Sequence, residues 1–143
     1  MAYDRDPAVA AALTIYLYII KVEATIQTCG RADSENAASY DKIYLTYRNE
    51  VARTVMNIGF VVGREVHLKG VEKETLFDSV RHLTETVMQD VERRAELDSR
   101  GFMDLCHDLP RAAAANVGLF APLTQQFPQE MNIILDSTQQ PEN

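Results

Sequence analysis

Two cysteines, Cys29 and Cys106, are the residues best suited to covalent or metal chemistry in this chain. A thiol can form a disulfide, ligate a metal ion or act as a nucleophile. Cys106 and His107 are adjacent rather than at C-x-x-C spacing, so on a helix they point in different directions and make a poor metal pair. A thiol nucleophile needs a base that is close in space, and His107 is close only in sequence. A disulfide is therefore favoured, and two reduced, buried thiols are the alternative.

Carboxylates near the cysteines offer a weaker alternative, a site for a hard cation. Oxygen-rich clusters bind such cations, and one end of a helical bundle would gather four acidic residues, which are Asp33, Glu35, Asp104 and Asp108. No EF-hand spacing supports this site. We therefore expect neither a metal ion nor a cofactor.

The sequence carries no recognisable catalytic motif. It has no glycine-rich phosphate loop, no Ser–His–Asp signature and no haem-attachment motif. His107 with Asp104 or Asp108 is the best remaining acid–base pair, and nothing in the spacing favours catalysis. A non-enzymatic protein is therefore expected, and an enzyme is the third hypothesis.

Tyrosines suggest a different kind of site, a pocket for a small ligand. Tyr40, Tyr44 and Tyr47 recur at spacings of four and three, which places them on one face of a helix, and Tyr16 is a candidate from the preceding helix. A buried hydroxyl needs a hydrogen-bond partner, and a ligand in a pocket can supply one. Tyrosines at this spacing more often belong to the core, so the pocket is the alternative interpretation.

Size and charge narrow the classes of function. The chain has 143 residues, 46% of them hydrophobic, which is enough for one domain with a substantial core. Its net charge of −7 argues against nucleic-acid binding, which needs a concentrated basic surface. The same charge disfavours docking to anionic membranes. Glycine and proline often end helices and strands, and the chain has only six glycines and five prolines. A few long elements are therefore expected.

The first helix is expected to run from Pro7 to about Cys29. Asp6 is a good N-cap, Pro7 suits the first helical position, and Gly30 is a natural residue to end the helix. The apolar run over residues 7–20 is shorter than the roughly 20 residues that a membrane-spanning helix needs. The acidic residues before it are unlike the positive start of a signal peptide. Neither membrane insertion nor an export signal is therefore expected in this chain.

Three further helices follow from hydrophobic periodicity. The second has apolar residues at helical spacing throughout, namely Tyr40, Tyr44, Tyr47, Val51, Val55, Ile58, Val62 and Val66. The third has Leu76, Val80, Leu83, Val87 and Val91, and the fourth begins with Phe102, Leu105, Cys106 and Leu109. Gly70 and Gly101 are expected to separate the helices. Pro110 is expected to kink the fourth helix or to restart it with Asp108 as the cap, before it closes at Gly118.

These helices predict an all-α fold, an antiparallel up-and-down four-helix bundle with a kinked fourth helix and an irregular C-terminal tail. A single domain is expected over residues 1–135, with a flexible tail over 136–143. In such a bundle the end of the first helix and the start of the fourth lie together, which brings Cys29 within bridging range of Cys106. A disulfide would imply an oxidising compartment, the periplasm or the cell exterior.

The first helix has two apolar stripes where a peripheral helix needs one. One stripe holds Val9, Leu13, Tyr16, Leu17, Ile20 and Ala24, and the other holds Ile15, Ile19, Val22, Ile26 and Cys29. Three explanations remain open. The helix is central and the tail or the fourth helix covers its second side, or it forms a subunit or partner interface with Tyr18 as an anchor, or it lines a groove.

The leading functional hypothesis is a non-enzymatic exported protein that acts through protein–protein interaction, such as an adaptor, an inhibitor or an immunity-type module, with homodimerisation included. Its predicted interface consists of Ile15, Tyr18, Ile19, Val22 and Ile26. The alternative hypothesis is a helical carrier for a small ligand or a metal ion.

Overall fold

The computed structural model describes residues 6–69 and 73–139, and in these residues it contains helices and turns but no strand. The all-α class is therefore confirmed. The longer helices are α1 (Pro7–Ala32), α2 (Ala37–Lys69), α3 (Lys73–Leu97), α4 (Ser99–Ala115) and α6 (Pro128–Gln139). A single turn, α5 (Leu123–Gln126), and two 3₁₀ turns at Ser34–Asn36 and Gly118–Phe120 complete the described chain.

The start of α1 is fixed by the predicted cap. The Asp6 carboxylate accepts hydrogen bonds from the backbone N–H groups of Ala8 and Val9, at 2.9 and 3.2 Å. The predicted end is wrong, because α1 continues through Gly30 to Ala32. The Asp33 N–H donates to the Cys29 carbonyl at 2.8 Å, and this bond closes the last turn.

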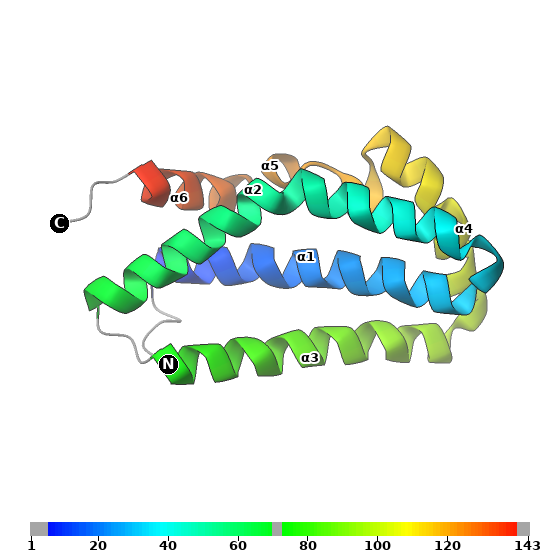
Figure 1. The fold of residues 1–143 in the computed structure, drawn as a ribbon, viewed down its shortest axis with the longest axis horizontal. Helices are drawn as coiled ribbons and strands as arrows, with labels where there is room; N and C mark the ends of the chain where they lie inside the picture. The colour runs from blue at the N-terminus through cyan, green and yellow to red at the C-terminus, as the bar shows by residue number, and fades with distance from the viewer. Residues whose placement is uncertain (1–5, 70–72, 140–143) are drawn as a thin grey trace.

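α1 is the central helix of the molecule. Figure 1 shows it in the middle, with α2 on one side and α3 on the other, running in alternating directions. α1 also packs against α4 and α6, so four helices contact it. The first of the three explanations for the two apolar stripes, burial inside the chain, therefore accounts for most of α1.

A four-helix bundle is not confirmed, because α4 is too short to be its fourth member. α4 has 17 residues against 33 in α2, and it ends before Asn116, which adopts a left-handed conformation with φ 56°. The chain then turns back through Gly118 (φ 61°), and α6 packs along α1 and α2. The fourth position is thus shared by α4 at the disulfide end and α6 at the other end (Figure 1).

The two glycines and the proline predicted to mark helix boundaries behave differently from one another. Gly101 lies in the first turn of α4, where its N–H donates to the Asp98 cap at 3.0 Å. Pro110 lies within α4, which continues past it, so a restart capped by Asp108 is wrong and the kink stays a prediction. Gly70 lies outside the described residues.

The C-terminal segment is more ordered in secondary structure than expected. α6 extends to Gln139, four residues beyond the predicted end of the folded domain at residue 135. Met131 and Ile134 of this helix are buried, as the fold-back of the C-terminal residues predicts. Residues 140–143 lie outside the described residues.

α1 is also long and apolar enough to cross a membrane, judged by length and composition alone, which corrects the comparison based on residues 7–20. Half of its most apolar 18-residue window is buried inside the fold. Core helices of folded domains share this property, so the predicted lack of membrane insertion stays a prediction.

Candidate functional site

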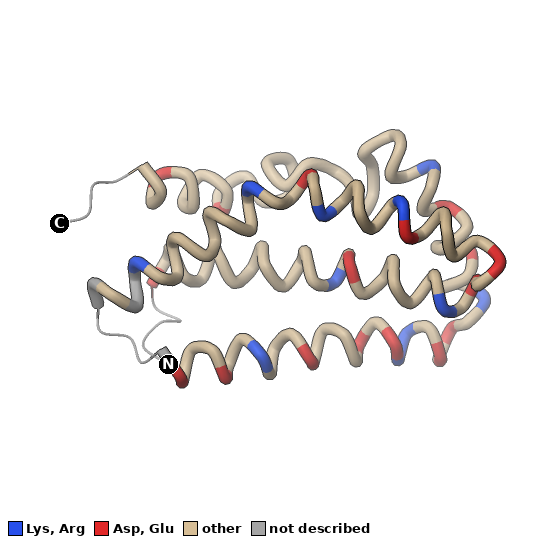
Figure 2. Tube along the Cα trace, in the orientation of Figure 1, with Lys and Arg blue, Asp and Glu red and all other residues tan. Residues whose placement is uncertain are grey.

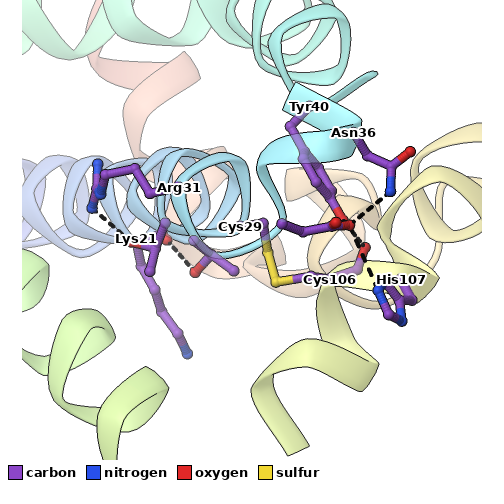
Figure 3. Close-up of a disulfide and its surroundings, with 10 residues drawn as sticks. Lys21, Cys29, Arg31, Asn36, Tyr40, Cys106 and His107 are labelled. Carbon is purple, nitrogen blue, oxygen red and sulfur yellow. Dashed lines mark hydrogen bonds and ion pairs between the residues drawn. A yellow bond between two sulfur atoms is a disulfide. The ribbon is translucent and has the colours of Figure 1, made fainter. Parts of the chain in front are cut away.

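The two cysteines lie together, as predicted. The Cys29 and Cys106 sulfur atoms are 2.11 Å apart, at disulfide distance, and their Cα atoms are 5.4 Å apart (Figure 3). The pair links the last turns of α1 to the second turn of α4, and both side chains are fully buried. A buried sulfur in a disulfide is neither a nucleophile nor a metal ligand.

A polar network surrounds this disulfide. The Tyr40 hydroxyl lies 2.8 Å from an Asp33 carboxylate oxygen and 3.2 Å from the Cys106 carbonyl (Figure 3). The Asn36 side-chain amide donates to the same Asp33 oxygen at 2.9 Å, and His107 Nε2 lies 3.6 Å from it. Burial, followed by the interaction with Asp33, raises the pKa of Tyr40 to about 12. Hydrogen bonds from Asn36 and Tyr40 lower the pKa of Asp33.

The four carboxylates predicted as a cation site do not converge. Asp33 is occupied by the network around the disulfide, and Asp108 accepts two hydrogen bonds from Arg111, at 2.7 and 2.8 Å, which lower its pKa. Glu35 and Asp104 complete no ligand set with them. Across residues 6–69 and 73–139, no three His, Cys, Asp or Glu side chains are placed to hold a metal ion.

His107, the weak catalytic candidate, has an ion-pair partner that was not predicted. His107 pairs with Asp33, which sequence spacing did not single out, rather than with Asp104 or Asp108. The reason is topological, because the turn after α1 and the start of α4 meet at the disulfide. This pair ties two elements together.

The four tyrosines predicted to form a pocket lie in two different places. Tyr40 and Tyr44 line a hollow of about 430 Å³ between α1 and α2. Tyr47 instead lines two adjoining hollows of about 330 and 390 Å³, between α2 and the segment from α4 to α5. A step of three residues rotates around a helix by about 60°, which separates Tyr44 from Tyr47. Tyr16 is half-buried and lines neither place.

Tyr47 differs from the other predicted pocket tyrosines in the hydrogen bonding of its hydroxyl. Its side chain is 5% exposed, its ring packs edge-on against Phe120 at 5.8 Å, and its hydroxyl has no hydrogen-bond partner among the described residues. Burial raises the pKa of this phenol far above its ordinary value. A buried hydroxyl without a partner costs stability, so this position is a candidate for a polar contact with a ligand.

The predicted partner interface on α1 is inside the molecule. Ile15, Ile19, Val22 and Ile26 are at most 1% exposed and belong to the main hydrophobic core with residues of α4, α6 and the 3₁₀ turn at 118–120. Tyr18, the predicted anchor, donates its hydroxyl hydrogen bond to the Leu119 carbonyl at 2.8 Å, and its ring packs against Phe127 at 5.1 Å. The chain itself therefore covers this stripe, which we call the closed stripe.

The other stripe of α1, which was not predicted as the interface, is the one left partly uncovered. Leu13, Tyr16, Leu17 and Ile20 are all half-buried. Figure 1 shows α1 running between α2 and α3. We call this surface the open side.

Contacts at its two ends place the open side between α2 and α3. At one end Leu13, Val62 of α2 and Val80 of α3 all pack against the same buried pair, Val9 and Leu76. At the other end Gln27 and Arg31 line a hollow with Asp41 and Tyr44 of α2, and Arg31 forms an ion pair with Glu92 of α3 at 3.7 Å. Leu13, Ile20 and Gln27 are seven residues apart and share one face of α1, so Ile20 lies midway along this side.

Both walls of the open side expose apolar side chains. On α2, Val55 follows Tyr44 by eleven residues and precedes Val62 by seven, so it shares their face, and it is 38% exposed. On α3, Met88 lies four residues before Glu92 on the same face and is 41% exposed. α3 packs mainly against α1. Its apolar residues extend around more of the helix surface than this one contact buries.

The α3 wall is acidic along its rim. Four carboxylates at spacings of four and seven share this edge, and they are Glu74, Asp78, Glu85 and Glu92. Arg81 is the one arginine among positions 74–92, and Figure 2 shows acidic positions recurring along α3. Glu85 lies seven residues before Glu92 on the same face, beside Met88, and its carboxylate forms no ion pair among the described residues. This rim was missed in the sequence, although the charge bias of residues 74–92 is visible there.

The α2 wall differs from the α3 wall in charge. It carries Asp41 at one end and Arg48, whose guanidinium lies 5.7 Å from the centre of the Tyr44 ring. From Ala52 to Gly63 its sequence holds one charge, Arg53. The open side is therefore an apolar strip with one acidic edge and one nearly neutral edge.

Comparison of the chain with protein-family models, with curated proteins and with solved structures gives no match.

Proposed function

We propose that this chain is a non-enzymatic, exported protein that binds another protein through the open side. The observation that carries the proposal is the half-buried stripe of Leu13, Tyr16, Leu17 and Ile20 on the central helix. Interfaces commonly combine such an apolar centre with a polar rim, and Val55, Met88 and Glu85 supply the walls and part of the rim.

The dimensions of the open side suit a helical partner. From Leu13 to Gln27 the axis of α1 rises by about 21 Å, at about 1.5 Å per residue. A helix of about four turns would cover this length and bury its apolar face between α2 and α3. Binding would give α3 a further neighbour beside α1 and α4 and would cover the open side of α1.

Export is supported by the disulfide, because such bonds persist in oxidising compartments. An apolar helix near the N-terminus is also compatible with export. α1 carries Cys29 and much of the core, so in this proposal it remains part of the mature fold. The intact mass of protein recovered under native conditions should be two hydrogens below the reduced mass, and a reduced pair would contradict the assignment of compartment.

Selection from an unbiased library of displayed helices tests the binding surface. We expect enriched helices to lose affinity for Val55→Glu and Met88→Glu, which place a charge on the two walls. The matched control is Leu135→Glu on α6, a residue of similar exposure at 37%. Helices that bind all three variants equally, or a library without binders, would count against the proposed function.

A second candidate function, small-ligand binding, rests on Tyr47. Its unpartnered hydroxyl and the hollows beside Phe120 favour a ligand with a flat apolar body and one polar atom. A thermal-shift screen of such compounds checks this candidate. Stabilisation of the native protein that disappears in Tyr47→Phe is expected, and equal stabilisation of both forms would place the ligand elsewhere.

A further inference from the structure

We infer that the partner of the open side is an amphipathic helix with Lys or Arg along one edge of its apolar stripe. This inference rests on the proposed function and adds the chemistry of the partner. It is carried by the difference in charge between the two walls that flank Leu13, Tyr16 and Ile20.

The acidic edge favours a cationic partner. Glu85 and Glu92 lie one on each side of Met88 along the same face of α3, and Asp78 lies one heptad before Glu85. Asp78 and Glu92 each have one arginine within 3.4 and 3.7 Å, whereas Glu85 has none. A Lys or Arg that docks beside Met88 would therefore neutralise an uncompensated carboxylate.

The α2 edge favours a neutral flank on the other side of the same partner. Arg48 already interacts with the Tyr44 ring and lies close enough to lower the pKa of Glu23, which burial raises. Beyond it the wall is formed by Val55 and Val62. A partner with positive charge on both edges would place one row against uncharged side chains, where it gains little.

The same charges disfavour a second copy of this chain as the occupant. Each copy has a net charge of −7. A symmetric pairing of open sides would place each acidic α3 rim either against the other copy's acidic rim or against its nearly neutral α2 wall, and neither supplies a row of cations. Like charges opposed across an interface are unfavourable. The acidic rim of α3 thus favours a partner that is a different chain and carries basic residues.

The probe for this inference is a capped peptide of 15 residues with Leu at helical positions i, i+3, i+7, i+11 and i+14. Lys occupies one flank, and Gln and Ala fill the remaining positions. Two matched peptides are compared with it, one with Glu in place of each Lys and one with the Lys sequence scrambled. Affinity for the full chain is measured by calorimetry, with helicity followed by circular dichroism.

We expect the Lys peptide to bind roughly tenfold more tightly than the Glu peptide at low salt, since two or three rim charges each contribute a few-fold. The difference should shrink as salt screens exposed charges. Glu85→Lys should weaken the Lys peptide by about threefold. Asp136→Lys on α6 changes the net charge equally and should have little effect.

The outcomes separate this inference from the function on which it rests. If Met88→Glu weakens the Lys and Glu peptides equally and both bind alike, the open side is a binding surface but the charge inference is overturned. If Met88→Glu weakens neither peptide, binding lies elsewhere and both proposals fail. A Lys peptide that binds no better than its scrambled form overturns the inference, as does a protein that dimerises through Met88.

Discussion

The two stripes of α1 have similar composition but differ in how far the rest of the chain buries them. Ile15, Ile19, Val22 and Ile26 are sealed by the C-terminal half of the chain, whereas Leu13, Leu17 and Ile20 remain half-buried. The disulfide explains part of the difference, because it fixes α4 to α1 at the foot of the closed stripe. An apolar stripe thus identifies a surface that will be buried. The connectivity of the chain decides whether another segment of the same chain buries it.

Removing the disulfide should have the largest effect on this comparison. We expect Cys29→Ala combined with Cys106→Ala to lower the free energy of unfolding by about 4 kcal/mol, because a long loop is no longer closed in the unfolded state. Urea denaturation measures this loss. Affinity for the helix that binds the open side should fall little, since the walls of that side are not held by the bond, and a loss below about 1 kcal/mol would contradict the anchoring role.

Truncation of neighbouring isoleucines compares the two stripes directly. Ile19→Ala should cost about 3 kcal/mol, because it leaves a cavity in the main core. Ile20→Ala should cost about 1 kcal/mol, since solvent already reaches that side chain. Equal losses in chemical denaturation would mean that the open stripe is as well covered as the closed one.

Removing the Tyr47 hydroxyl should change stability in the opposite direction. Tyr47→Phe deletes a buried polar group that lacks a partner, and we expect a gain of up to about 1 kcal/mol. Tyr40→Phe is the matched control, which should lose about 1 kcal/mol because its hydroxyl bonds Asp33. Thermal unfolding of the two variants should shift in opposite directions, and a common shift would refute the assignment.

Two helical glycines give the smallest expected effects. A Cβ on Gly59 of α2 would meet no atom within 4 Å, so Gly59→Ala should stabilise the helix by about 0.5–1 kcal/mol. A Cβ on Gly101 would clash with the Asp98 carboxylate, so Gly101→Ala should destabilise α4. Denaturation midpoints of the two variants should therefore lie on opposite sides of the parent protein.

Local sequence signals predicted the parts of the fold that depend on neighbouring residues. Asp6 and Pro7 marked the start of α1, and Tyr40, Tyr47, Val51 and Ile58 follow the buried face of α2. Val55 follows the same period and yet is 38% exposed. Periodicity records which side chains share a face, and it carries no information about what packs there.

The disulfide could be predicted because helix order restricts which ends meet. The burial of the predicted interface could not be read from the sequence, because it depends on the chain after α4 folding back over Ile15, Ile19 and Ile26. α4 ends just before Asn116, which adopts a left-handed conformation, and the sequence signalled this turn only through Gly118. That one turn returns the last part of the chain to the closed stripe and leaves the other uncovered.

The bond between Cys29 and Cys106 also sets the mechanics of the molecule. It joins two residues 77 positions apart and so closes all of α2 and α3 into a covalent ring. Tension between the two ends of the chain would pass from α1 through the sulfur atoms to α4. The chain between the cysteines would carry no load, so about 260 Å of extended chain, at about 3.4 Å per residue, would not be released by pulling. A protease cut between α2 and α3 would likewise leave both walls of the open side joined to α1 and α4.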